Sequence, residues 1–103
     1  PFDRESFDLV FTCGVLIHID RNKLAGVLSE VARVAQRFVL LMEYESPEER
    51  VIPWRDQAAA LWKASYSRMF HEQNTAFVWL DDGFLPKTAG FDDVTWALFM
   101  RGG

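Results

Sequence analysis

The sequence predicts an α/β fold in which two parallel strands are joined by a crossover helix and are followed by a second helix and an antiparallel pair of strands. Two apolar runs, 7–12 and 37–45, flank an amphipathic helical pattern, and a strand, a helix and a strand within about 35 residues form one βαβ unit. A second helical pattern covers 55–73. Two strand-like runs, 74–86 and 92–101, come last, and their short connection favours antiparallel pairing.

The first strand, Phe7 to Thr12, is apolar almost throughout, and its apolar run resumes at Val15 after Gly14. A run of this kind is typical of an interior parallel strand that is covered on both faces. With 103 residues, the chain forms one domain at most. Its beginning, "PFDRES", resembles the middle of a polypeptide, so we expect a partial domain.

The first helix is predicted to start at Asp20, whose carboxylate can accept hydrogen bonds from the free amides of a first helical turn. Gly26 inside the helix costs about 1 kcal/mol relative to alanine, which close packing against a neighbour would explain. Apolar residues recur at spacings of three and four and form one stripe: Leu24, Val27, Leu28, Val31, Val34 and Ala35.

The second strand, "RFVLLMEYE", changes abruptly from apolar to polar at 43–45. The stretch 46–54 contains two prolines and predicts a loop. In the last pair of strands, Asp81 and Asp82 precede Gly83. Because neighbouring strand residues point to opposite faces, this triplet predicts a bulge or bend and not a metal site.

The composition excludes several classes of function. The net charge is -4, from 11 basic and 15 acidic residues, and no basic stripe is present, so we expect no nucleic-acid partner. No apolar run approaches the ~20 residues that a membrane span needs. Cys13 is the only cysteine, which excludes a disulfide framework and a thiolate metal cluster. These features favour a cytoplasmic protein that does not bind membranes or metal.

Candidate site residues follow the two parallel strands. Ligands of open α/β sheets collect at the carboxyl ends of the strands. That rule selects Thr12, Cys13, Gly14 and His18 after the first strand. It also selects Glu43, Tyr44 and Glu45 after the second strand, at the same edge of the sheet.

The motif "FDLVFTCGVLIHI" resembles the fourth-strand motif of class I S-adenosylmethionine-dependent methyltransferases. The ordered set "GVLIHID", "EYESP", "IPWR", "LWKASYSRMF", "DDGF" and "DDVTW" is similar, more narrowly, to the methyltransferases associated with pseudaminic acid biosynthesis. The resemblance covers nearly the whole chain. It implies the C-terminal half of a Rossmann-like methyltransferase sheet, whose seven strands end in an antiparallel pair.

The resemblance also implies S-adenosylmethionine as cofactor and a small-molecule acceptor, such as a sugar or sugar nucleotide. Thr12, Cys13 and Gly14 then correspond to positions that border the cofactor, and His18 and residues 43–45 to the acceptor side. The family binds its cofactor chiefly through a glycine-rich loop after its first strand, and the sequence contains no G-x-G element. The principal cofactor-binding half is therefore expected to be absent from these residues.

Each candidate role has an alternative. His18 can act as a general base because its ordinary pKa is near neutrality, or it can hydrogen-bond the turn into the helix. Glu43 and Glu45 can bind an amine or sugar hydroxyls, or they can form the charged end of a strand. Arg55 can hold a carboxylate or phosphate of the acceptor, or it can be a solvated residue at a helix start.

Two functions follow from this pattern. The first is half of a methyltransferase that is inactive until the cofactor-binding half is supplied. The second is a non-catalytic α/β module that functions through association. In the family the first strand of this chain is central, so here it becomes an apolar edge with unpaired backbone groups. We expect the chain to self-associate, or to be completed by a second chain, through Phe7 to Thr12.

Overall fold

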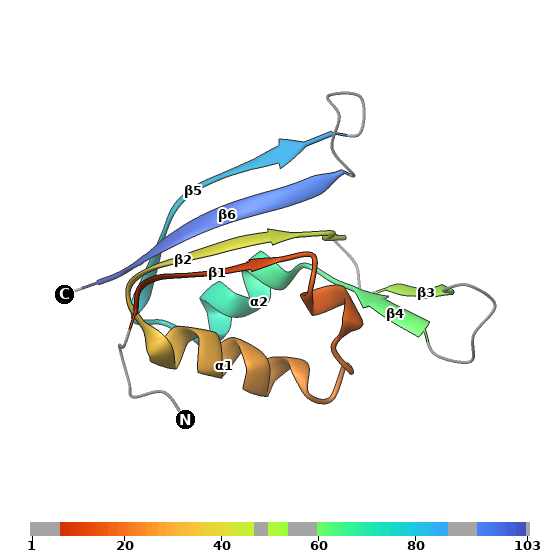
Figure 1. The fold of residues 1–103 in the computed structure, drawn as a ribbon, viewed down its shortest axis with the longest axis horizontal. Helices are drawn as coiled ribbons and strands as arrows, with labels where there is room; N and C mark the ends of the chain where they lie inside the picture. Colours follow the sequence, from red (N-terminus) through yellow and green to blue (C-terminus); the bar gives the residue numbers. More distant parts are fainter. Residues whose placement is uncertain (1–6, 47–49, 54–59, 87–92, 103) are drawn as a thin grey trace.

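The structure, a computed structural model, describes residues 7–46, 50–53, 60–86 and 93–102, with the backbone alone at 50–53 and 60–63. Figure 1 shows a twisted sheet with two helices on the same side of it. The described part of the chain contains no helix that is both long and apolar enough to cross a membrane.

The main sheet has four strands in the order β1-β2-β6-β5. The strands are β1 (Phe7–Cys13), β2 (Ala35–Glu43), β6 (Val94–Arg101) and β5 (Phe77–Leu85). β1 and β2 run parallel, whereas β6 is antiparallel to both β2 and β5. The parallel pair and the terminal antiparallel pair are therefore as the sequence predicts.

One face of this sheet carries the core. Two helices, α1 (Leu24–Val34) and α2 (Tyr66–Gln73), pack against it. Alternate strand residues point toward the helices and are fully buried, as expected from the two-residue period of a strand. The main buried members of this core are Leu24, Leu28, Val39, Leu41, Tyr66, Phe70, Phe77, Ala97 and Phe99.

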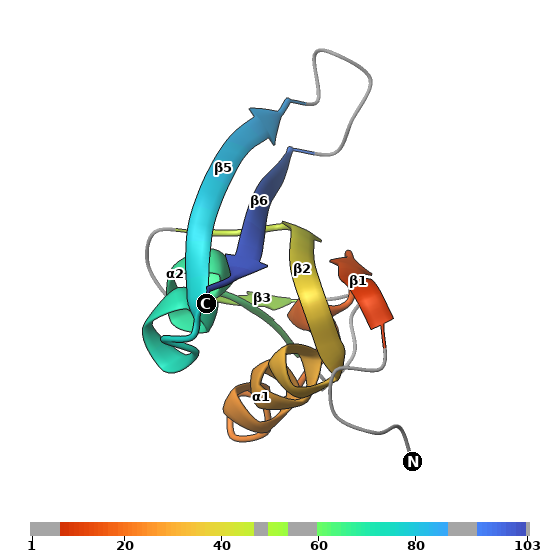
Figure 2. The ribbon, with the colours of Figure 1, turned by 90° about the vertical axis from the view of Figure 1, so that its left-hand side faces the viewer.

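The other face of the sheet, which we call the open face, is apolar and lacks a covering helix among the described residues (Figure 2). Leu9 and Phe11 of β1 are 49% and 63% exposed, and Val78 of β5 is 51% exposed. The predicted covering of β1 on both faces is thus not found among the described residues. Half-buried members of the open face are Phe38, Leu40, Met42, Trp96, Leu98 and Met100.

The start of α1 and the segment before α2 differ from the sequence prediction. Helix α1 has Lys23 at its N-cap, without a side-chain cap, because the main chain first makes a turn in which Lys23 N donates to Asp20 O. The predicted loop at 46–54 contains β3 (Arg50–Pro53), and the predicted helix at 55–73 contains β4 (Ala60–Lys63), which pairs antiparallel with β3. Within the described part of that range, residues 60–63 are a strand and the helix is α2, because a short apolar run fits either period.

The β5–β6 pair contains the predicted bulge, where the register shifts between Trp79 and Asp81. Beyond it, Gly83 pairs with Trp96. A Cβ atom on Gly83 would collide with Trp96 Nε1. The Trp96 indole therefore occupies the space that a side chain at residue 83 would need.

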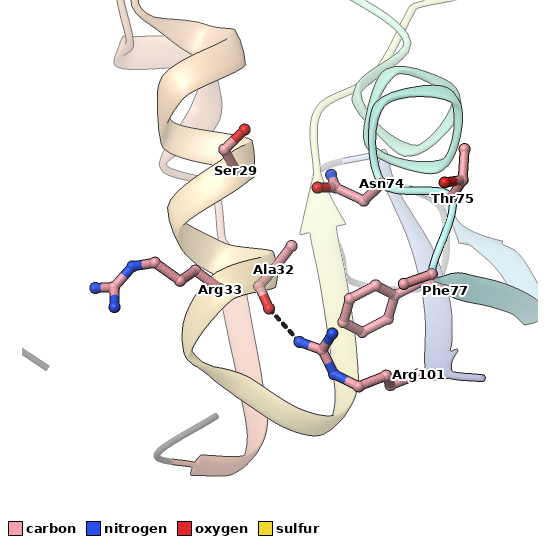
Figure 3. A pocket seen from close by; sticks show the side chains of 8 residues that line it. Ser29, Ala32, Arg33, Asn74, Thr75, Phe77 and Arg101 are labelled. Atoms are coloured by element: carbon pink, nitrogen blue, oxygen red, sulfur yellow. Dashed lines mark hydrogen bonds between the residues drawn. The ribbon is translucent and has the colours of Figure 1, made fainter. Parts of the chain in front are cut away.

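At the end of the sheet where β2 begins, Arg101 ties β6 to the C-terminus of α1. Its Nη2 atom donates to Ala32 O at 2.6 Å and to Ala35 O at 2.7 Å, and its guanidinium lies 4.6 Å from the Phe77 ring centroid (Figure 3). These bonds satisfy carbonyls that a helix C-terminus leaves unpaired. Arg101 also lines a 350 Å³ cavity together with Ser29 and Asn74. This cavity lies at the opposite end of β2 from the predicted site.

Candidate functional site

The carboxyl ends of β1 and β2 lie side by side, as their parallel pairing requires. Cys13 pairs with Met42, and Gly14 N donates to Met42 O at 2.9 Å. The two groups of candidate residues, 12–14 and 43–45, are therefore neighbours at one edge of the sheet.

Gly14 turns the chain out of β1. Its φ angle is +65°, in the left-handed region that favours glycine. The Tyr44 ring covers the turn, since Tyr44 Cε2 would lie 3.4 Å from a Cβ atom at residue 14. The turn leads into a short 3₁₀ helix, η1 (Leu16–His18). Tyr44 and the main chain of Gly14 thus form one wall of the site.

Glu43 is fully buried beneath η1. Its Oε1 atom accepts a hydrogen bond of 2.9 Å from Leu16 N, which is the first amide of η1. Glu43 Oε2 and Thr12 Oγ1 are also buried, and neither forms a hydrogen bond within the described residues. Glu43 therefore holds η1 over the end of the sheet.

The burial of Glu43 favours the protonated form of its carboxyl group. Loss of hydration raises the pKa of the Glu43 carboxyl above its ordinary value of 4.5. The nearby Thr12 hydroxyl and the amides of the β1–η1 turn lower the pKa, but by less than burial raises it. The buried carboxyl is thus easier to protonate than an exposed glutamate.

Glu45 holds the first turn of α2 by hydrogen bonds, as Glu43 holds η1. Its two oxygens accept hydrogen bonds from Ser67 N at 3.0 Å and from Ser67 Oγ at 2.5 Å, in the first turn of the helix. Burial raises the pKa of Glu45, and the negative charges of Glu43 and Asp82 add to this rise. A carboxylate at this position also interacts favourably with the positive end of the helix dipole.

The remaining candidates are more accessible. His18 is exposed at the end of η1, and Cys13 is exposed on the same side of β1 as Leu9 and Phe11. The structure thus brings Thr12, Cys13 and Gly14 together with Tyr44, whereas Arg55 lies outside the described residues. The roles of these residues stay predictions.

Sequence reasoning missed Ser67, which is buried and holds both oxygens of Glu45. A helix predicted to start at residue 55 places Ser67 in its interior, where a serine has no evident purpose. A helix that starts at Tyr66 places Ser67 in the first turn. The sequence signal for the start of α2 was Ser67 itself, because serine favours positions near the start of a helix.

At this edge of the sheet, the described residues form a single border with one glycine turn. Gly14 is the single glycine with positive φ among them, so no glycine-rich turn of several residues is available to approach a bound cofactor. The accessible groups at the border are Cys13 and the main chain of Gly14. Within the described ranges, no three His, Cys, Asp or Glu side chains gather as metal ligands.

No protein-family model and no curated protein sequence matches the chain. Solved structures do match. One is 1,6-didemethyltoxoflavin-N1-methyltransferase from Burkholderia thailandensis with bound 1,6-didemethyltoxoflavin and S-adenosylhomocysteine, with a TM-score of 0.76 and 13% identity over 97% of this chain and 46% of that chain. Another is the PH0226 protein from Pyrococcus horikoshii OT3, with a TM-score of 0.64 and 13% identity over 97% and 54%.

These likenesses establish the fold. The mixed α/β architecture is that of a Rossmann-like half, similar to part of a methyltransferase. The chain spans about half the length of each of these two structures.

Proposed function

We propose that this chain is the acceptor-side half of an S-adenosylmethionine-dependent methyltransferase that acts on a small molecule. One observation carries the proposal: the turn at Gly14 and the segment 43–45 meet at the carboxyl ends of two parallel strands, in a fold similar to a methyltransferase that binds S-adenosylhomocysteine. Ligand sites of open α/β sheets form at this position.

S-adenosylmethionine supplies an electrophilic methyl group to such a site. The chain's own residues orient the acceptor and receive its proton, because a hydroxyl or a protonated amine must lose a proton as it is methylated. His18 is the proposed base, since it is exposed beside this edge on η1. Glu43 supports His18 indirectly, because it holds the first turn of η1 in place.

The proposed acceptor is a sugar or a sugar nucleotide. The resemblance to methyltransferases of pseudaminic acid biosynthesis favours this class. Tyr44 is half-buried against Gly14 and offers an aromatic ring and a hydroxyl to an acceptor. Arg55 is the proposed contact to an acidic group of the acceptor. The proposed compartment is the cytoplasm.

The alternative function is a non-catalytic association module. Glu43 and Glu45 favour it in one respect, because each already serves a structural purpose, at η1 and at α2 respectively. The two functions differ in whether any completed form of the chain transfers a methyl group.

Calorimetric titration with S-adenosylhomocysteine tests the proposal. We expect no binding by the chain alone and saturable binding after addition of the cofactor-binding half. One-to-one binding by the chain alone would contradict a half site. If the completed protein does not bind S-adenosylhomocysteine either, the methyltransferase assignment is wrong and the association module remains.

A further inference from the structure

We propose that the carboxyl end of β5 binds an organic ammonium group of the acceptor, which lies against the ring of Phe84 and pairs with the carboxylate of Asp82. Both residues are on the face of the sheet that carries the two helices, which we call the helix face. The inference deepens the proposed function, because it rests on a small-molecule acceptor at this edge of the sheet and assigns the charge of that acceptor.

The last residues of β5 lie at the same edge of the sheet as the candidate site. Because β6 is antiparallel to both β2 and β5, the strands β2 and β5 run in the same direction and their carboxyl ends share one edge. Thr95 of β6 pairs with Glu43 on one side and with Phe84 on the other. Phe84 is thus two strands from Glu43, about 10 Å across the sheet. A group bound beside Phe84 therefore serves to recognise the acceptor and is not itself methylated.

The register of β5 places Asp82 and Phe84 on the helix face. Asp82 pairs with Ala97, which is fully buried in the core beneath the helices. Phe84 follows two residues later and lies on the same side of the strand. Gly83, between them, pairs with Trp96 of the open face. A carboxylate and an aromatic ring are therefore neighbours on one side of β5.

Helix α2 does not cover this part of the helix face. Figures 1 and 2 show that β5 and β6 extend beyond α2 at this edge of the sheet. Phe77, earlier in β5, is buried against Phe70 of α2, whereas Phe84 is 57% exposed and Asp82 is also exposed. An exposed ring beside a carboxylate suits an organic cation, since the ring face attracts positive charge and the carboxylate accepts hydrogen bonds.

The charges around Asp82 favour a cation. Burial is the main cause of the raised pKa of Glu45, and the negative charge of Asp82 adds to the rise, so these two carboxyl groups are close. Both oxygens of Glu45 already accept hydrogen bonds from Ser67, which leaves Asp82 as the accessible one. Within the described residues, neither carboxylate forms an ion pair, and Arg68, the exposed cation that follows Ser67, pairs with neither.

Other ligand classes fit this surface less well. A carboxylate or phosphate would bring negative charge next to Asp82 and Glu45, and a hydrocarbon would bury the Asp82 carboxylate without a hydrogen bond. An ammonium group has three hydrogen-bond donors and no acceptor. It can donate to Asp82 and to the hydroxyl of Thr95, which pairs with Phe84, while it lies against the ring.

Glucosamine is the probe, added to the chain without cofactor at about pH 6, where its amino group is protonated. Nuclear magnetic resonance titration measures its dissociation constant for the natural chain, Phe84→Ala and Asp82→Asn. We expect saturable binding that each substitution weakens about fivefold or more. Phe84→Tyr keeps an aromatic ring and is expected to keep the affinity. Glucose, which has a hydroxyl in place of the ammonium group, is expected to bind at least about fivefold more weakly.

Asp81→Asn is the matched control. It removes the same charge from the neighbouring residue, which pairs with Leu98 of the open face. The asparagine oxygen can still accept the hydrogen bond that Asp82 N donates to the Asp81 side chain. We expect this variant to bind glucosamine as the natural chain does. Circular dichroism checks that every variant folds.

A second readout is the pKa of Glu45. Glucosamine is expected to lower it, because the bound ammonium group compensates the negative charge of Asp82. Asp82→Asn is expected to lower it without any ligand. A purely structural role of Asp82 would not make the pKa of Glu45 respond to glucosamine.

Any of three results would overturn the proposal: no binding of glucosamine, equal affinity for glucose, or binding that Asp82→Asn weakens no more than Asp81→Asn does. The proposed function fails separately. If the chain binds glucosamine through Asp82 but the completed protein does not bind S-adenosylhomocysteine, the methyltransferase assignment is wrong and the ammonium site stands. If the completed protein binds S-adenosylhomocysteine but not glucosamine, the ammonium site is wrong and the methyltransferase assignment stands.

Discussion

At the scale of single residues, the buried carboxyl of Glu43 makes the stability of the protein depend on pH. Its folded pKa lies above 4.5, so the folded state binds its proton more tightly than the unfolded state does. The free energy of unfolding is therefore higher below the unfolded pKa and declines as pH rises through the folded pKa. Glu45 has the same sign and adds to this decline.

We predict that Glu43→Gln raises the unfolding temperature at pH 8 and flattens the dependence on pH between 4 and 8. The glutamine oxygen can still accept the hydrogen bond from Leu16 N, but it carries no charge to desolvate. Thermal unfolding across this pH range measures both effects. Parallel curves for the two proteins would show that Glu43 does not contribute.

Glu43→Ala is the matched control. It leaves Leu16 N without its acceptor, and an unsatisfied buried donor costs about 1–3 kcal/mol. We expect this variant to be less stable than Glu43→Gln at every pH.

Gly83 gives a second prediction at this scale. A methyl group there collides with Trp96 Nε1, so Gly83→Ala must displace the indole and is expected to cost about 1–3 kcal/mol. Denaturant unfolding measures the loss, and a change in tryptophan fluorescence is expected with it. Gly26→Ala is the control, because open space surrounds residue 26 and alanine stabilises a helix by about 1 kcal/mol over glycine. Equal effects of the two substitutions would contradict this account.

At the scale of elements, α2 depends on the contact between Glu45 and Ser67. Ser67→Ala removes the hydroxyl bond and is expected to cost about 1 kcal/mol and to raise the pKa of Glu45 further, since that bond lowers it. Nuclear magnetic resonance titration of Glu45 measures the pKa. Ser65→Ala is the control, because the Ser65 side chain makes no capping hydrogen bond. A pKa of Glu45 that is unchanged in Ser67→Ala would refute the contact.

The helices and strands that were predicted correctly have a clear apolar periodicity or clear turn residues in the sequence. The apolar runs of β1 and β2, the spaced stripe of α1 and the bulged terminal pair depend on local periodicity and turn residues. The prediction of a helix at 60–63 was wrong. The alanine, leucine and tryptophan of this segment suit a helix locally, but the strand β4 forms there because it pairs with β3, which is a tertiary contact. The prediction that α1 starts at Asp20 was wrong for a related reason. A turn at 21–23 comes first, so that the helix begins at Leu24.

The candidate site was predictable in position but not in detail. Parallel strands place residues 12–14 and 43–45 at one edge whatever their side chains do. The engagement of Glu43 with η1 and of Glu45 with α2 depends on where those helices begin. The apolar periodicity of the sequence does not give these starting points, and Ser67 in the first turn of α2 is the sequence signal for the second of them.

At the scale of the whole molecule, the open face exposes apolar side chains of β1 and β5, including Leu9, Phe11 and Val78. Contiguous exposed apolar surface promotes association. We predict that the chain alone forms concentration-dependent aggregates and that Phe11→Lys reduces them without loss of stability, since Phe11 is 63% exposed. Sedimentation over a concentration series measures the effect.

Phe84→Lys is the control for this prediction. Phe84 is 57% exposed but lies on β5, at the other edge of the sheet. We expect it to change association less than Phe11→Lys does. A compact monomer at high concentration in the natural chain would contradict the predicted self-association.

The bonds from Arg101 to Ala32 and Ala35 also constrain when the protein can reach its final state during synthesis. The α1–β2 junction leaves the ribosome about 66 residues before the arginine that satisfies its carbonyls, since residue 101 is bonded to residue 35. A nascent chain that ends before residue 101 therefore lacks the hydrogen bonds that join β6 to the C-terminus of α1. Because domains are made from the N-terminus onward, the βαβ unit must wait for the synthesis of β6 and Arg101 before these bonds can form.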